Sequence, residues 1–404
     1  MKTVYLHLGT PKTATSSIQV ACERNSKLLR KYGYSFPLFS YKYPGVRIER
    51  NGHFLVEASV MSSRIPDSDI SWQERLKLGL DMIHTELENY DNVILTDESL
   101  WRSLNYNRQS PLQLLQKDAD EYGYDIKLVV YLRRQDSFLI SRWNQFVKEG
   151  KMNTSLAEHL DWMLEHEPLV VDYASALDRL SSQIGRENII VRRFEPSSWV
   201  GGTIYTDFVK AVGLPSDLPL QPPARDVNPG LKGNMVEMQL LLNRLPSLSL
   251  EDKVYFSRFS KKISERLPAK DQYNIFSAEE TLQFLEQFRK GNEHVVTEYI
   301  RDGQPLFSYE VKDFPKWSQN NPWFLKDTAD FLCELPAKKR AFLMNALPME
   351  TQVLFLTAMV LRLETRVADL EKLNAGEEKN DGKNQDLITK ISRKIGSLSH
   401  PMEQ

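Results

Sequence analysis

The N-terminal stretch constrains the fold more than any other part of the chain. An apolar run of strand length, Val4 to Leu8, ends at Gly9-Thr10-Pro11, and helical spacing of apolar residues begins after Lys12. The pattern predicts a strand, a tight loop and a helix. A helix N-terminus presents unpaired backbone N–H groups at the positive end of its dipole. A cation and four hydroxyls, from Lys12, Thr13, Thr15, Ser16 and Ser17, would join them, so we expect this loop to bind an anion.

The loop differs from the Walker A phosphate loop. That motif has glycine and lysine at its sixth and seventh positions, and counting from Gly9 those positions hold Ala14 and Thr15. A P-loop nucleotide triphosphatase is therefore not indicated. An ordinary strand-to-helix turn, in which a threonine or serine caps the helix, remains the alternative explanation.

A second cationic site is predicted after residues 125–132. This near-continuous apolar run suits a central parallel strand that is covered on both faces. Arg133 and Arg134 follow it, and Ser141 comes eight positions after Arg133 in the next predicted helix. A guanidinium with a hydroxyl donor beside it binds a phosphate monoester well. For Arg134, simple solvation at the edge of the sheet is the alternative.

Two residues are candidate general bases. Glu98 follows an apolar strand, residues 92–97, whose polar end lies where open α/β sheets bind ligands. It could equally assist a helix cap formed by Thr96 or Asp97. His53 lies in residues 40–64, which we predict to be a long surface loop, and a packed surface histidine is the alternative there. The sequence does not choose between His53 and Glu98.

These motifs resemble those of sulfotransferases. Residues 11–16, Pro-Lys-Thr-Ala-Thr-Ser, are similar to the 5′-phosphosulfate-binding loop of that family, except that Ala14 stands where the family has glycine. Arg133 and Ser141 have the spacing of the family's 3′-phosphate-binding segment. A further strand, residues 187–195, and a helix ending in Gly213-Leu214-Pro215 look like those of bacterial carbohydrate sulfotransferases.

The resemblance implies a fold and a reaction. The fold is α/β, with a parallel sheet flanked by helices as in P-loop NTPases, followed by a helical C-terminal extension. The donor would be 3′-phosphoadenylyl sulfate (PAPS), the product adenosine 3′,5′-bisphosphate, and the acceptor a hydroxyl of a carbohydrate such as a cell-surface polysaccharide or glycolipid. Lys12 would stabilise the leaving group during an in-line transfer that needs no metal.

The resemblance also implies a set of donor ligands. They are Pro11, Lys12, Thr13, Ala14, Thr15, Ser16, Ser17, Arg133 and Ser141, with Arg192, Arg225 and Lys232 as further cations. For Arg192 a surface arginine is the alternative. The loop of residues 225–234 lacks the Arg-Lys-Gly with which cytosolic sulfotransferases close over the nucleotide.

Two other functions are weighed against this one. A P-loop-type kinase that phosphorylates a small or glycan acceptor would have similar topology, but it needs the missing Gly-Lys pair and an acidic Mg²⁺ ligand. A non-catalytic scaffold could keep the nucleotide site and act through its C-terminal helix. ATP turnover with Mg²⁺ would favour the kinase, and donor binding without transfer would favour the scaffold.

Composition limits the partners and the compartment. With 52 Lys and Arg against 54 Asp and Glu, the net charge of -2 gives no bulk attraction to nucleic acid. The two cysteines, Cys22 and Cys333, are far apart and have no metal-ligand spacing, which favours a reducing, cytoplasmic location. We see no secretion signal, and the apolar run of residues 351–361 is too short to span a bilayer. Peripheral contact with a membrane stays open.

The chain is predicted to have four parts. Residues 1–301 form the catalytic domain, and residues 302–348, which are interrupted by prolines and tryptophans, form a linker or docking segment. Residues 349–374 form an amphipathic helix with partial heptads that pairs subunits into a homo-oligomer or packs on the main domain. Residues 375–404 form a charged tail that we expect to be mobile.

Overall fold

A computed structural model describes residues 2–10, 12–43, 50–60, 70–105, 110–222, 230–266, 273–312, 314–318, 320–321 and 323–376. Pro11, Arg225 and residues 377–404 of the predicted tail lie outside them. The chain forms two compact units. Unit 1 comprises Met1–Arg142, Leu156–Pro229 and Ala278–Lys312, and unit 2 comprises Trp143–Ser155, Gly230–Ser277 and Asp313–Gln404.

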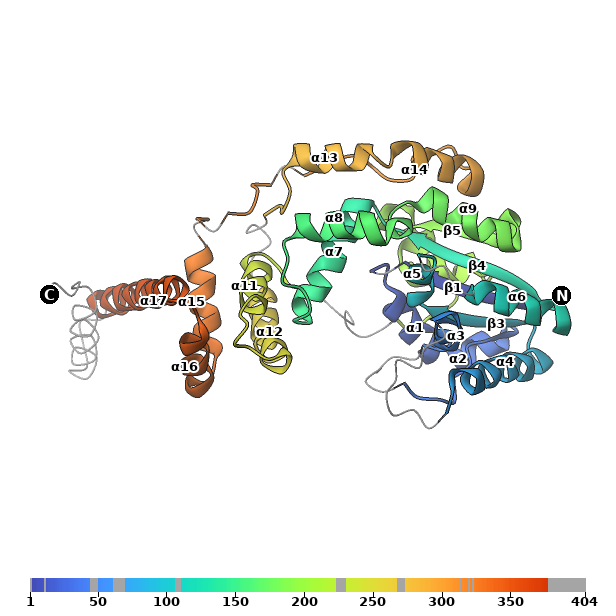
Figure 1. Cartoon of the computed structure of the whole chain (residues 1–404), viewed down its shortest axis with the longest axis horizontal. Coiled ribbons are helices and arrows are strands. Elements are labelled where there is room, and N and C mark those ends of the chain that lie inside the picture. Colours follow the sequence, from blue (N-terminus) through green and yellow to red (C-terminus); the bar gives the residue numbers. More distant parts are fainter. Residues whose placement is uncertain are drawn as a thin grey trace. The chain divides into compact units, whose positions relative to one another are not determined.

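Unit 1 contains a five-stranded sheet in the order β2-β3-β1-β4-β5 (Figure 1). The strands are β1 (Thr3–Gly9), β2 (Tyr34–Ser35), β3 (Asn92–Asp97), β4 (Asp125–Leu132) and β5 (Ile189–Arg193). Every neighbouring pair is parallel. The carboxyl ends of the strands therefore meet at one edge, with β1 between β3 and β4.

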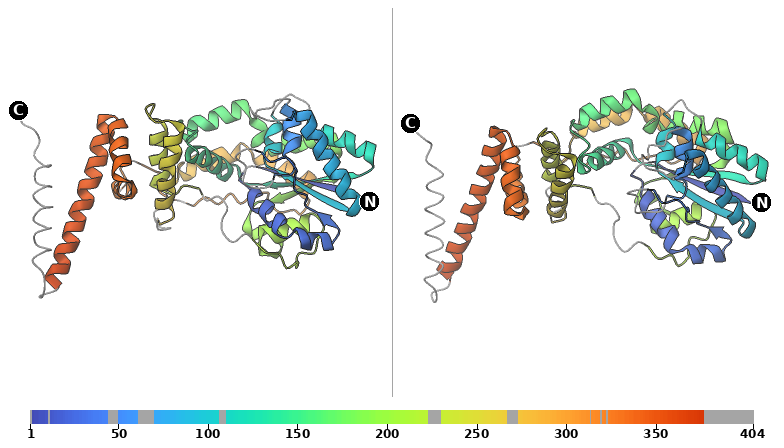
Figure 2. Two further views of the ribbon diagram at one scale, coloured as in Figure 1. Left: turned by 90° about the horizontal axis from the view of Figure 1, so that it is seen from below. Right: turned by 60° about the horizontal axis from the view of Figure 1, so that its bottom comes forward.

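Helices lie on both faces of this sheet (Figures 1 and 2). The helices of unit 1 are α1 (Thr15–Arg24), α2 (Ser26–Lys31), α3 (His53–Val60), α4 (Trp72–Asn89), α5 (Ser99–Ser103), α6 (Pro111–Tyr122), α7 (Gln135–Lys148), α8 (Leu156–His166), α9 (Tyr173–Ile184), α10 (Ile204–Ala211), α13 (Ala278–Glu286) and α14 (Arg289–Val295). The last residues of α7 belong to unit 2. Single helical turns occur at Pro168–Val170, Arg186–Asn188, Pro196–Ser198, Val200–Gly202 and Val296–Ile300.

The core around the sheet explains why these strands are mainly apolar. On one face, Ile94 and Val129 pack against Ile18 of α1 and Phe208 of α10, and all four side chains are buried. Burial on this scale is the main favourable contribution to folding. The predicted fold class, a parallel sheet flanked by helices with further helices in the C-terminal part, is confirmed.

Unit 2 is helical in its described part. Its helices are α11 (Asn234–Asn243), α12 (Leu250–Ser264), α15 (Phe324–Glu334), α16 (Ala337–Ala346) and α17 (Met349–Gly376). Met235, Phe256, Phe331 and Phe355 are fully buried in its core. Among the residues described, no helix combines the length and apolar character needed to cross a bilayer.

Two segments differ from their predicted conformation. Residues 302–348 were predicted as a linker or docking segment, but they include α15 and α16, whose Phe331 and Leu343 are fully buried. The prolines that suggested a linker lie before α15. Residues 40–64 were predicted as a loop, but they include α3, which packs against α4 and α5. Burial of an apolar face stabilises such short helices, and a sequence pattern cannot show that packing.

The predicted catalytic range draws on both units. Residues 230–266 fall within the predicted range 1–301 but belong to unit 2, together with residues 323–376. Packing between segments that are distant in the sequence decides which residues belong to each unit, so these boundaries could not be predicted from the order of the segments along the chain.

Candidate functional site

The ends of three neighbouring strands carry the predicted site residues. Leu8 of β1 is in register with Asp97 of β3, and Gly9 is in register with Tyr131 of β4. The loop after β1 therefore lies between Asp97 on one side and the segment that follows β4 on the other. This is the edge at which open parallel sheets bind ligands.

The loop after β1 has an unusual backbone. Lys12 has φ 70° and Ala14 has φ 59°, so two residues with side chains adopt the left-handed conformation. Each costs about 1–2 kcal/mol relative to the right-handed region. Ala14 thus adopts a backbone conformation that glycine would favour, although it carries a side chain.

Threonines and one glycine hold the loop in this shape. The Thr10 hydroxyl donates to the Tyr131 carbonyl of β4, and Oγ1 of Thr13 donates to the Thr10 carbonyl at 2.6 Å. Both side chains are fully buried. A Cβ on Gly9 would lie 2.1 Å from Oγ1 of Thr15, so only glycine allows this approach.

Helix α1 begins without a side-chain cap. Its N-cap residue is Ala14, which has no side chain to accept a hydrogen bond from the first turn. The alternative of a threonine or serine cap therefore does not describe this turn. Oγ1 of Thr15 is buried and has no hydrogen-bond partner in the described part of the chain. Backbone donors and an unsatisfied hydroxyl in the first turn are suited to an anion.

Arg133 connects the end of β4 to this loop. Its Nη1 donates to the carbonyl of Lys12 at 2.9 Å, and its guanidinium lies 5.6 Å from the centre of the Phe194 ring. The hydroxyl of Tyr173 donates to the Arg133 carbonyl at 2.6 Å. Burial lowers the pKa of Arg133, although its ordinary value is so high that it stays charged. The two predicted anion-binding segments are therefore in direct contact.

The remaining loop hydroxyls and Ser141 are partly buried. Ser16 and Ser17 lie in the first turn of α1, and Ser141 lies in the second turn of α7. No contact joins Ser141 to Arg133 among the described residues, and their joint role in binding a phosphate stays a prediction.

His53, Asp97 and Arg50 form a charged cluster at the end of β3. Nδ1 of His53 lies 2.9 Å from Oδ2 of Asp97. Arg50 donates to both carboxylate oxygens, from Nε at 2.9 Å and from Nη2 at 2.7 Å. The backbone N–H of Ser99 donates to Oδ1 at 2.6 Å. Asp97 is fully buried, so all of its stabilisation comes from these partners.

The electrostatics keep Asp97 ionised. Burial alone would raise the pKa of Asp97, but the charge of Arg50 and the hydrogen bonds from His53 and Arg50 outweigh burial and hold it well below its usual range. An ionised carboxylate only accepts hydrogen bonds, so Nδ1 of His53 carries the hydrogen that it donates. In neutral His53 the lone pair is then on Nε2.

Asn51 places His53 at the start of α3. Its Oδ1 accepts from the Thr96 backbone at 2.9 Å, and its Nδ2 donates to the carbonyls of Pro37 and Ile94 at 3.0 Å each. The backbone at Gly52 lies so close to β3 that a Cβ added there would be 3.3 Å from the Thr96 backbone.

The other candidate base, Glu98, is the half-buried N-cap residue of α5, and its side chain does not cap that helix.

Sequence reasoning missed the roles of Arg50 and of Asp97 as a partner for His53. Asp97 was noticed only as a polar residue at a strand end, and 44 residues separate it from His53. The one available signal was position: Asp97 ends a predicted strand, and His53 lies in a segment predicted to be a surface loop of the kind that often carries binding groups.

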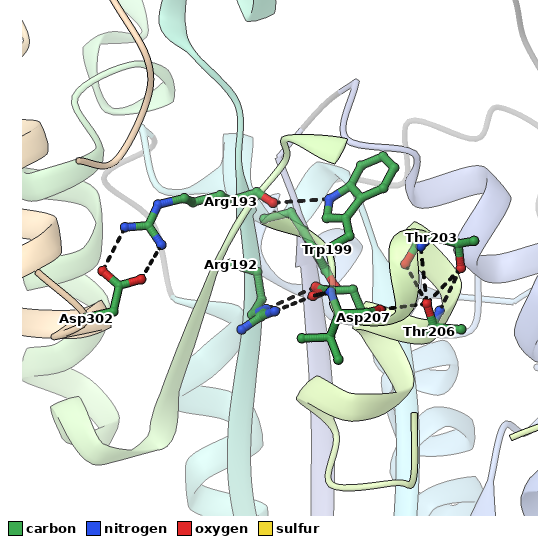
Figure 3. Close-up of polar contacts among 9 residues, drawn as sticks. Arg192, Arg193, Trp199, Thr203, Thr206, Asp207 and Asp302 are labelled. Carbon is green, nitrogen blue, oxygen red and sulfur yellow. Dashed lines mark hydrogen bonds and ion pairs between the residues drawn. The ribbon is translucent and has the colours of Figure 1, made fainter. Parts of the chain in front are cut away.

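Arg192 is engaged by a buried carboxylate. Figure 3 shows its Nε and Nη2 on the two oxygens of Asp207. Asp207 is fully buried and also accepts from the hydroxyl of Tyr131 at 2.6 Å and from the Val200 backbone at 2.9 Å. The neighbouring Arg193 pairs with Asp302 (Figure 3). A ligand role for Arg192 stays a prediction, and a structural ion pair now accounts for the residue without one.

The structure leaves the roles of the other predicted donor ligands untested. Lys232 belongs to unit 2, where its backbone N–H donates to Oγ of Ser264 at 3.0 Å. Arg225 and Pro11 lie outside the described residues. The guanidinium of Arg134 pairs with Asp136 and also donates to the carbonyls of Ser308 and Glu310.

Comparison with known proteins gives distant similarities. No protein-family model matches the chain. An uncharacterised protein of Archaeoglobus fulgidus is 28% identical over 201 residues, which cover 48% of this chain and 52% of the relative, so the match spans about half of that protein's length. Among solved structures, a sulfotransferase from Alicyclobacillus acidocaldarius is similar with a TM-score of 0.34 and 18% identity, over 62% of this chain and 95% of that one.

Proposed function

We propose that this protein is a sulfotransferase that moves a sulfuryl group from PAPS to a hydroxyl of a carbohydrate. The contact between Arg133 and the Lys12 carbonyl carries the proposal. It joins a left-handed, hydroxyl-rich loop at a helix N-terminus to a strand-end arginine, and a nucleotide with phosphates at its 3′ and 5′ positions needs two such neighbouring anion sites.

In this proposal the loop after β1 holds the 5′ side of the donor. Lys12 neutralises the charge that develops on the bridging oxygen as the bond from that oxygen to sulfur breaks. The backbone N–H groups and the hydroxyls of Thr15, Ser16 and Ser17 assist it. Arg133 and Ser141 hold the 3′-phosphate and thereby orient the donor for in-line attack.

The acceptor side is assigned to His53. As the new bond between the acceptor oxygen and sulfur forms, Nε2 of His53 takes the acceptor proton, and the ionised Asp97 stabilises the resulting imidazolium. Arg50 keeps Asp97 ionised and in place. Glu98, the N-cap residue of α5, is the other candidate base.

Calorimetric titration with adenosine 3′,5′-bisphosphate tests the donor site. We expect binding that weakens about 10–100-fold when the 3′-phosphate is absent, as in AMP, or when Arg133 is changed to alanine, because a charge-assisted hydrogen bond is lost. Arg193→Ala is the matched control, since it also removes a strand-end arginine, one that is bound by Asp302. Equal affinity for the bisphosphate and AMP would rule the proposal out.

A transfer assay tests the reaction and the acceptor class. The protein is incubated with PAPS and a panel of polysaccharides and glycolipids, and each acceptor is examined by mass spectrometry for the addition of a sulfuryl group. Donor binding without transfer to any acceptor would favour the scaffold function instead. ATP turnover that requires Mg²⁺ would favour the kinase.

A further inference from the structure

Helix α17 has two apolar faces, and the described residues of unit 2 cover one of them. Phe355 and Ala358 are fully buried in the core of this unit, and Arg362 pairs with Asp330 of α15. These positions, spaced by three and four residues, define the face that packs on α15. Because α17 is much longer than α15, it extends past it (Figure 2).

The other face carries a heptad repeat. Its members, separated by alternating steps of four and three residues, are Met349, Val353, Leu356, Val360, Leu363, Val367 and Leu370. Met349 is 79% exposed, Val353 57%, Leu356 51% and Leu363 39%. A run of large apolar side chains this exposed along one helix face is typical of an interaction site. We call these seven residues the α17 seam.

The residue types in the seam identify the occupant. If the valines at 353, 360 and 367 are given heptad position a, then every d position of the seam holds leucine or methionine. β-branched residues at a and leucine at d favour a two-stranded parallel coiled coil. A second copy of this helix presents the same pattern and therefore fits the seam in register.

The charges beside the seam select the parallel orientation. With valine at a, Arg366 is at a g position, and Glu350, Glu364 and Glu371 are at e positions. In a parallel pair, Arg366 of each helix faces Glu371 of the other, and opposite charges attract. In an antiparallel pair, e positions face each other, so glutamates would meet glutamates and repel.

We propose that two copies of this chain associate through the α17 seam as an in-register, parallel, two-stranded coiled coil. The proposal gives the predicted subunit pairing a register, an orientation and a set of contact residues, and it is independent of the proposed function.

Disulfide trapping in the full chain tests the orientation. In a background with Cys333→Ser, which removes the exposed native thiol, we introduce Leu356→Cys or Leu370→Cys and apply a mild oxidant. A parallel in-register pair places each residue opposite its own copy, so both variants should form cross-linked dimers. An antiparallel pair can place at most one of the two positions opposite itself. Thr365→Cys, which is exposed on another face of the same helix, is the control that should not cross-link.

Oligomeric mass tests the association itself. By light scattering at micromolar concentration, the full chain should be a dimer, and Leu363→Glu should weaken dimerisation by about 100-fold or more, because two buried glutamates would replace two leucines. Thr365→Glu should leave the dimer intact, and circular dichroism should report unchanged helix in both variants. A monomeric wild-type chain, as would result if another segment of the same chain covered the seam, overturns the proposal. So does a dimer in which only one or neither seam cysteine cross-links.

Discussion

Replacing Asp97 by asparagine should reduce both stability and catalysis. The substitution keeps the size of the side chain but removes the charge that Arg50 and His53 face. Breaking a buried ion pair costs about 3–5 kcal/mol when one charge is left unpaired. The Arg50 side chain is 19% exposed, so water compensates part of this loss, and we expect about 2–3 kcal/mol.

The loss in catalysis should exceed what the stability loss explains. Without the carboxylate, nothing fixes Nδ1 of His53 as the donor, and the imidazolium formed during proton transfer loses its counter-charge. Removal of general-base assistance lowers turnover by about 100-fold or more. Affinity for adenosine 3′,5′-bisphosphate should be unchanged, because Arg133 and the loop after β1 do not depend on Asp97.

Asp207→Asn is a closely matched control. Asp207 is also fully buried, also pairs with an arginine, and also accepts from one further side chain and one backbone N–H. Its side-chain partners are Arg192 and Tyr131 instead of Arg50 and His53. We expect a similar loss of stability without the loss in turnover.

Thermal unfolding and steady-state sulfuryl transfer would be measured for both variants. A loss of 2–3 kcal/mol should lower the unfolding temperature of a domain of this size by about 5–10 °C. The assays are run well below that temperature. If both variants lost turnover to the same extent, or if Asp97→Asn kept normal turnover, the assignment of His53 as the base would be refuted.

Three further changes test the loop and the core. Ala14→Gly should raise stability by up to about 1 kcal/mol in thermal unfolding, because glycine adopts φ 59° without strain, and a clear loss would contradict that backbone. Lys12→Met should reduce transfer about 100–1000-fold while bisphosphate binding persists, since the Lys12 carbonyl still meets Arg133; loss of binding together with transfer would argue against a transition-state role. His7 is fully buried, and burial lowers its pKa to about 3. Its unfolded pKa is about 6.5, so below that pH the unfolded chain gains a proton that the folded chain does not, and stability falls as the pH falls. His7→Phe should therefore remove about 2 kcal/mol of the stability loss between pH 7.5 and 5 in denaturant unfolding, and an unchanged pH dependence would show that His7 does not titrate in this way.

Local chemistry made several elements predictable from the sequence. The apolar run at residues 4–8, the glycine that ends it and the helical spacing after it correspond to β1, the loop and α1. The strand at residues 125–132 matches β4. Such patterns are readable because strand and helix periodicity and turn residues act over a few positions.

Helices stabilised by packing were harder to predict. The sequence around α3 and α15 lacks a clear signal, since a short helix is only marginally stable by itself and forms because it buries an apolar face. The backbone of Ala14 was equally unpredictable, since alanine disfavours the left-handed region and only the surrounding contacts hold it there.

The sequence by itself determined which strands end in polar residues, and therefore that an anion site with a nearby acid or base was to be expected at one edge of a sheet. Only the tertiary structure decided how those residues pair. It brings His53 to Asp97, and Arg133 to the Lys12 carbonyl, while it directs Arg192 to Asp207. The physical reason is that these partners are joined by the order of strands in the sheet, which depends on the packing of the whole unit and leaves no periodic trace along the chain.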